Sequence, residues 1–273
     1  MGARLLLCRT LLVLSVGAPA EAVGLLRAAL AAISEGAMWE GLSPSHEALL
    51  RAQRLTLLSH VQMMRQQRPA APNAAEQAPQ LGLLLRGGGA DAILHAHVLL
   101  SVVGHALDAS ADAPPSRRSG VNSEARLRSA HASTLAALEK CAAAAPLGAA
   151  IHSLHAAAAT RLGGDAPAAR EKAEEAVGTA TAMGLPYVRA LALAERGRCE
   201  AGRPAEQAAS YRAAHELFSS LGAAHDVFLM EGLMGLNTAG WAFDLPDEDE
   251  DEGEDDDESN SMCSSTSEED DEA

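Results

Sequence analysis

Histidine is the residue type through which this sequence most readily does chemistry, because a neutral imidazole binds metals and accepts protons near neutral pH. The chain has ten histidines, and two pairs are close in sequence. His152 and His155 are three residues apart and share a helix face, whereas His95 and His97 are two apart and face different directions. No Cys, Asp or Glu lies at a spacing that would complete a zinc site with either pair. We therefore predict that the histidines are solvated or hydrogen-bonded locally on helices.

Sequence motifs for other chemistry are missing as well. The chain contains no GxSxG or HExxH motif and no cysteine in a catalytic context. The glycine triplet 87–89 lacks the Lys-Ser/Thr pair of a phosphate-binding loop, so we interpret it as a turn. Glu174 and Glu175 lie near Arg170 and Lys172, a combination typical of a solvated helix face. The sequence predicts no catalytic residue, no metal and no cofactor, and hence no enzyme.

The elements that hold these residues are predicted to be helices. Of 273 residues, 59 are alanine, only seven are aromatic, and 48% are hydrophobic. Alanine is the strongest helix former, whereas strands favour the β-branched and aromatic side chains that are scarce here. The composition predicts an all-α fold with a core of small side chains and argues against an all-β fold or a doubly wound sheet.

Charge is concentrated at the C-terminus. The net charge is −16, and residues 247–273 hold 16 acidic residues and no basic one. The remaining 246 residues carry 21 acidic and 21 basic side chains and are neutral. Without a basic surplus, and with few aromatic rings to stack on bases, direct nucleic-acid binding is not expected.

Cysteine use and hydropathy indicate a reducing compartment without a membrane span. The four cysteines are spread widely and form no CxxC pair, which favours free, mostly buried thiols over a disulfide framework. We predict that no apolar run reaches the roughly 18 residues that cross a bilayer. Residues 1–20 fit either a cleaved leader or a core helix over 4–17, and the helical pattern that continues downstream favours the helix.

Short breaks divide the chain into helical segments. We predict helices at 4–17, 20–35, 45–66, 74–86, 90–109, 123–144, 147–162, 166–183, 187–201, 204–221 and 224–242. The breaks are mostly Gly and Pro, which end one helix and begin the next. Two polar stretches, 68–79 and 110–122, are predicted to be exposed loops. The helices form one domain over 1–243.

The second half of the chain repeats itself after about 38 residues. Glycines and small or apolar residues recur at equivalent positions, which pair Gly164 with Gly202, Ala176 with Ala214, Met183 with Leu221, and Gly184 with Gly222. Small residues at fixed positions let antiparallel helices approach closely, and periods of this length are typical of tetratricopeptide-like arrays. The repeat predicts a helical-repeat solenoid of antiparallel helix pairs with a right-handed superhelix.

The tail over 244–273 is predicted to be disordered, since its like charges repel and it has little apolar surface to bury. Ser265, Thr266 and Ser267 each precede an acidic residue by three positions, a pattern that acid-directed kinases favour. These residues are therefore candidate phosphorylation sites. The alternative is an unmodified solubilising tail, and in either case the tail is suited to a basic protein surface.

Several segments, in order, resemble a known family. They are TLAALEKC (134–141), RLGGDAPAA (161–169), AREKAEEAVGTATAMG (169–184), LPYVRALALAERGRC (185–199) and the two helices over 208–240. This order is similar to the C-terminal repeats of the subunit 5 family of the anaphase-promoting complex, over about 123–240, and more weakly over 49–108.

The resemblance implies a non-catalytic scaffold within a cell-cycle ubiquitin ligase, surrounded by other protein subunits, in the nucleus and cytoplasm. The family is much longer than this chain, and the acidic tail is not part of its pattern. A generic tetratricopeptide-like adaptor is the alternative, such as the solenoid subunit of the cohesin loader or the repeat region of bacterial MalT-like regulators.

Overall fold

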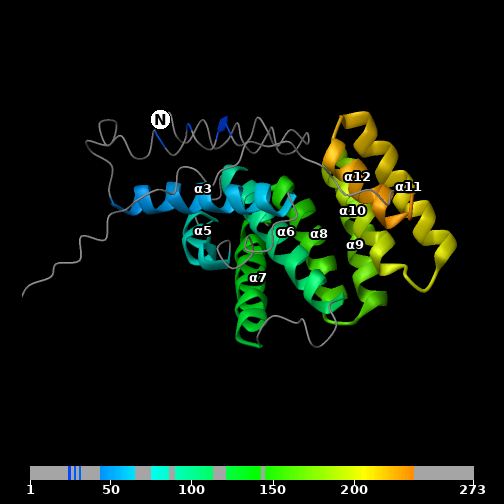
Figure 1. The fold of residues 1–273 in the computed structure, drawn as a ribbon, viewed down its shortest axis with the longest axis horizontal. Helices are drawn as coiled ribbons and strands as arrows, with labels where there is room; N and C mark the ends of the chain where they lie inside the picture. The colour runs from blue at the N-terminus through cyan, green and yellow to red at the C-terminus, as the bar shows by residue number, and fades with distance from the viewer. Residues whose placement is uncertain are drawn as a thin grey trace, which may run out of the picture. The chain divides into compact units, whose positions relative to one another are not determined.

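The computed structural model of the chain is helical throughout the part that it describes, namely 44–64, 75–85, 90–112, 121–142, 145–236 and four single residues between 24 and 31. The helices are α3 (Pro44–Met64), α5 (Ala78–Leu85), α6 (Ala90–Asp112), α7 (Val121–Ala142), α8 (Pro146–Leu162), α9 (Ala166–Ala182), α10 (Pro186–Cys199), α11 (Pro204–Leu221) and α12 (Ala224–Leu233). Within these residues no strand occurs, so the all-α prediction is confirmed (Figure 1).

The helix boundaries differ from prediction at three places. Helix α6 runs to Asp112 and α7 starts at Val121, which shortens the predicted loop over 110–122. Helix α5 begins at Ala78, inside the predicted loop over 68–79. The last predicted helix was expected to reach 242, but α12 ends at Leu233 because Gly235 is left-handed, with φ of 70°. Three predictions lie outside the described residues, apart from the four residues between 24 and 31. They are the helices 4–17 and 20–35, the glycine turn 87–89 and the disordered tail.

The 38-residue period reappears in the backbone hydrogen bonds. Leu185 N–H donates to the carbonyl of Ala180 at 2.9 Å, and 38 residues later Ala223 N–H donates to Phe218 at 3.0 Å. Gly184 and Gly222, which stand just before these donors, have φ of 64° and 70°, a conformation that favours glycine. Helices α10 and α12 likewise begin 38 residues apart, at Pro186 and Ala224.

The other repeat positions fall into turns and buried helix faces. Gly164 is left-handed, with φ of 89°, whereas Gly202 is exposed in a turn without positive φ. Met183 and Leu221 lie half-buried at the ends of α9 and α11. Ala176 and Ala214 are completely buried in the same two helices.

Each described helix packs against the described helices before and after it in sequence. From α6 to α12 every consecutive pair is in contact, and α8 additionally contacts both α6 and α10. Helix α3 lies on α5 and α6 (Figure 1). Four alanines of α9 (Ala169, Ala173, Ala176 and Ala180) are completely buried. Such small side chains permit the close approach of α9 to α8 and α10.

Helix α6 contains a longer apolar segment than we predicted from the sequence. Within the described residues, its segment Ala92–Ala111 is long and apolar enough to span a membrane by length and composition. Over half of that window, 56%, is buried inside the protein. Helix α6 contacts α3, α5, α7 and α8, so packing within the bundle accounts for its apolar composition.

Replacing Ala214 with leucine tests the close contact at α11. Ala214 has no exposed surface, and Leu adds three carbons for which the packed core has no room. We expect Ala214→Leu to lower the free energy of unfolding by about 1–3 kcal/mol. Ala209 is exposed on the same helix, so Ala209→Leu is the matched control and should change it little. Equal stability of the two variants in urea unfolding would contradict the proposed packing.

A second test uses two glycines inside helices. A Cβ at Gly197 of α10 would collide with the ring of Tyr211 on α11, whereas a Cβ at Gly178 of α9 would meet nothing within 4 Å. Gly197→Ala should therefore destabilise the protein by about 1–3 kcal/mol through overpacking. Gly178→Ala should instead stabilise it by about 0.5–1 kcal/mol, because alanine favours the helix. Thermal unfolding of the pair measures the difference, and a stabilised Gly197→Ala would show that Tyr211 moves aside freely.

Candidate functional site

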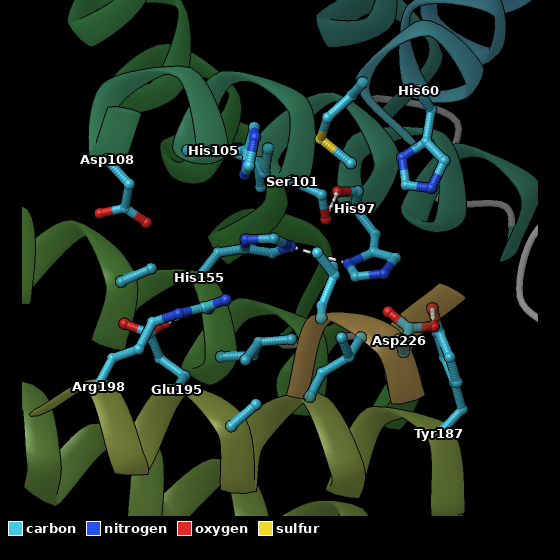
Figure 2. A pocket seen from close by; sticks show the side chains of 18 of the residues that line it. His60, His97, Ser101, His105, Asp108, His155, Tyr187, Glu195, Arg198 and Asp226 are labelled. Carbon is cyan, nitrogen blue, oxygen red and sulfur yellow. Dashed lines mark hydrogen bonds and ion pairs between the residues drawn. The ribbon is translucent and has the colours of Figure 1, made fainter. Parts of the chain in front are cut away.

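A cavity of about 150 Å³ lies where α3, α6, α8, α10, α11 and α12 meet. Figure 2 shows polar side chains gathered around it. Its polar residues are His60, His97, Ser101, His105, Asp108, His155, Arg161, Tyr187, Glu195, Arg198, His225 and Asp226. Its apolar lining includes Met63, Leu100, Leu154, Leu191, Phe218, Leu229 and Met230. The cavity is thus an apolar chamber with polar groups on opposite sides.

One side of the cavity is an ion-pair network centred on Arg161 of α8. Its guanidinium donates to both carboxylate oxygens of Asp108 on α6, at 2.7 and 2.9 Å, and its Nε donates to Glu195 on α10 at 2.6 Å. Glu195, whose side chain is only 3% exposed, also accepts from Arg198 at 3.1 Å. Burial alone would lower the pKa of Arg161, but its bonds to Asp108 and Glu195 raise it overall. The network therefore holds α6, α8 and α10 together through ion pairs.

Two imidazoles meet in the middle of the cavity. His97 Nδ1 and His155 Nε2 are 2.9 Å apart, so one ring donates its proton to the other. Burial lowers the pKa of His97 to about 4. Burial, followed by neighbouring histidines, lowers the pKa of His155 well below its ordinary value. Both rings are therefore neutral at physiological pH, joined as a neutral hydrogen-bonded pair.

The opposite side of the cavity pairs a phenol with a carboxylate. The hydroxyl of Tyr187 on α10 donates to Asp226 Oδ2 on α12 at 3.1 Å. Burial raises the pKa of Asp226 to about 6, although the Tyr187 bond and the charge of Arg198 act in the other direction. Burial, together with Asp226, raises the pKa of Tyr187 well above its ordinary value. The phenol therefore remains a proton donor to Asp226.

His60 of α3 and His105 of α6 also line the cavity, and burial lowers the pKa of each. Burial lowers the pKa of His60 to about 3, helped by His225, His97 and His105. The Nδ1 of His60 is enclosed and has no hydrogen-bond partner within the described part of the chain. His60 thus contributes a neutral ring to the cavity lining, with its Nδ1 covered by protein atoms.

The prediction that the histidines are solvated or hydrogen-bonded locally is wrong where the structure buries them or pairs them between helices. His95, His131, His155 and His225 are buried, and five histidines line the cavity. The different directions predicted for His95 and His97 agree with the structure, because His95 is fully buried while His97 lines the cavity. His152 does not join His155 there. His155 is instead paired with His97, which lies on another helix. Spacing within one helix does not reveal such pairs.

One signal for the cavity was present in α6. His97, Ser101, His105 and Asp108 follow one another at intervals of four, four and three residues in an otherwise apolar segment. Such spacing puts them on one face of a helix. All four line the cavity, so a polar stripe on this apolar helix was an available indication of it.

The described residues form neither a metal-binding group nor a reactive thiol site. Among the described residues, no group of three or more His, Cys, Asp or Glu side chains is placed to hold a metal ion. Cys141 is buried and Cys199 is partly buried, and both are free thiols. Burial raises the pKa of the Cys199 thiol to about 12, which keeps it protonated. Cys8, Cys263 and the candidate phosphorylation sites Ser265, Thr266 and Ser267 lie outside the described residues.

Comparison of the chain with protein-family models, with curated proteins and with solved structures finds no match in any of the three. Inference about function therefore depends on the residues themselves and on their arrangement.

The buried histidines predict a loss of stability in acid. The folded pKa of His60 is about 3 and that of His97 about 4, against 6.5 when unfolded. Between these values the unfolded chain binds more protons, so stability falls as pH drops below about 6.5, by up to about 1.4 kcal/mol per pH unit for each such group. Asp226 opposes this between about pH 6 and 4, because its folded pKa is raised, but it offsets only one histidine.

We expect the free energy of unfolding in urea to fall between pH 7 and pH 5, and His60→Gln to make that slope shallower. Gln keeps a polar side chain but cannot take up a proton in the unfolded state. His152→Gln is the control, since His152 does not line the cavity. Equal slopes for His60→Gln and the wild type would show that His60 does not contribute to the acid sensitivity.

Proposed function

We propose that the chain is a tetratricopeptide-like helical-repeat scaffold that works by binding other proteins and has no catalytic residue. The observation that supports this most strongly is the succession of helix pairs α6–α7, α8–α9 and α10–α11, in which the first helices α6, α8 and α10 contact one another. Solenoids are built in this way, since each unit packs mainly on its neighbours. Such stacking produces an extended surface for protein partners.

Sequence detail within the last pair supports the same proposal. Ala214 and Phe218 on α11 are four residues apart and both fully or almost fully buried. They match the alanine and phenylalanine of the second helix in a tetratricopeptide unit. Tyr211 lies against Gly197 on the first helix of the pair, so a large side chain fills the space that a glycine leaves. This complementarity is what a stacked repeat requires.

The sharper form of the proposal is a subunit 5-like scaffold of the anaphase-promoting complex, a ubiquitin ligase of the cell cycle. It rests on the segment resemblance over about 123–240. Its partners would be other protein subunits of that complex, in the nucleus and cytoplasm, without direct contact to nucleic acid or membrane. The broader form is a generic adaptor of another assembly, such as the cohesin loader.

The acidic tail is a second region of the chain that would bind a protein partner. Its carboxylates suit a basic protein surface, and phosphate on Ser265, Thr266 or Ser267 would add further negative charge. The tail therefore complements the repeat region, which has no charge surplus of its own.

Affinity purification of the tagged chain from its own dividing cells, with mass spectrometry, tests the scaffold proposal. We expect several stoichiometric protein partners that remain bound when residues 247–273 are deleted, because the repeat region supplies the main surface. Cross-links from those partners should fall on the described helices. Recovery of a cullin, a RING subunit and other repeat subunits would support the ligase form.

A chain that lacks only the tail is the control that separates the two binding regions. Partners lost on this deletion belong to the tail, and partners kept belong to the repeats. A set of unrelated stoichiometric partners would favour the generic adaptor. Elution of both versions as free monomers from the same cells would contradict the scaffold proposal in either form.

A further inference from the structure

The charges that line the cavity do not balance. Two arginines, Arg161 and Arg198, face three carboxylates, Asp108, Glu195 and Asp226. Both arginines are bonded to Asp108 or Glu195 in the network described above. Asp226 forms no ion pair within the described part of the chain, and its hydrogen bond is to the neutral phenol of Tyr187. The cavity therefore has one unpaired negative charge, at the end formed by α12.

Four of the five imidazoles that line the cavity have a pKa lowered by burial, and the fifth, His225, is not among the groups that shift the pKa of Asp226. His60, His97 and His155 are neutral at physiological pH because burial lowers the pKa of each. The carboxylate of Asp226 has no ion-pair partner among the described residues and lines the chamber. A donor that brings N–H groups and a positive charge would satisfy it.

The rest of the lining is suited to a small hydrocarbon group. A volume of about 150 Å³ is enough for a benzene ring, and this cavity has that volume and is partly open to solvent. Met63, Phe218 and Leu229 are among its apolar residues. The rings of Tyr187 and Phe218 stand edge to face, with centroids 5.7 Å apart.

We propose that this cavity binds a small primary ammonium ion with a short alkyl or benzyl group, and that Asp226 is its counter-ion. The ammonium lies at the Asp226 end, and the hydrocarbon group lies against the apolar lining. Arg198 also faces the cavity, but Glu195 holds its guanidinium at 3.1 Å. The site does not depend on the scaffold proposal, since it is formed by the packing of the helices alone.

A structural explanation of Asp226 competes with this proposal. Asp226 lies in the first turn of α12, where the helix dipole favours a negative charge. Glu206 has the same position in α11 and is exposed to solvent. A carboxylate that serves only the helix should behave like Glu206, so the two residues form a matched pair of variants.

Isothermal titration calorimetry of the full chain at pH 7.5 tests the proposal with three probes of similar size, namely benzylammonium, benzyl alcohol and benzoate. We expect benzylammonium to bind at least tenfold more tightly than the other two. Asp226→Asn should weaken benzylammonium at least tenfold, whereas Glu206→Gln should leave its affinity unchanged. Equal affinity for benzylammonium and benzyl alcohol, or tighter binding of benzoate, would overturn the proposal.

The pH dependence of the wild type gives a measurement that needs no variant. Benzylammonium stays protonated from pH 8 to pH 5, while Asp226, with a pKa of about 6, takes up a proton. Binding should therefore weaken about tenfold between pH 8 and pH 5. Among the other titratable groups of the lining, Tyr187 stays protonated, and His60 and His97, with pKa values of about 3 and 4, stay neutral in this range. Burial also lowers the pKa of His105 and His155. Arg161 and Arg198 are paired with Asp108 and Glu195, and His225 is the neighbour of Asp226 on α12. An affinity that does not change over this range would exclude Asp226 as the counter-ion, even if Asp226→Asn fails to fold.

Discussion

The close approach of helices on alanine is the constraint on which the rest of this structure depends. An alanine side chain buries little apolar surface, so each contact contributes modestly to stability. The chain compensates with many helix crossings, and α8, α9, α10 and α11 each pack on the next. Completely buried alanines in α9 set the spacing of the middle pairs. Where a larger ring appears, as at Tyr211, the facing position is a glycine.

Arg161 has a different task from the alanines. Bidentate bonds to Asp108 and a further bond to Glu195 join three helices that are far apart in sequence. A buried ion pair adds little net stability compared with well-packed apolar residues. Removal of one partner, however, strongly lowers the free energy of unfolding because the other charge is left buried and unpaired. The network therefore defines which helices lie side by side more than it adds stability. It also leaves the two arginines occupied, so that the charge of Asp226 is the one that stays unpaired.

Sequence reasoning succeeded where local signals determine structure. Proline at the start of α10 and α11 and glycine at 184 and 222 mark boundaries that the structure reproduces within two residues. It failed for α12, whose end depends on the single left-handed Gly235. The cavity was out of reach, since His60, His97, His155 and Asp226 come from four helices and meet only through tertiary packing. The periodicity of a single helix does not show which side chains of different helices come into contact. The polar stripe of α6 was the one indication of the cavity.

The 38-residue offset also relates Asp226 of the cavity to a core position in α10. Val188 of α10 and Asp226 of α12 lie 38 residues apart, and Val188 is buried in the core while Asp226 faces the cavity. Helix α10 packs against α8, α9 and α11, whereas α12 packs on α11. The two positions therefore have different surroundings, and at the cavity burial raises the pKa of the Asp226 carboxyl to about 6. Positions related by this offset can thus carry a core side chain in one helix and a cavity-lining charge in another, according to the helices that surround them.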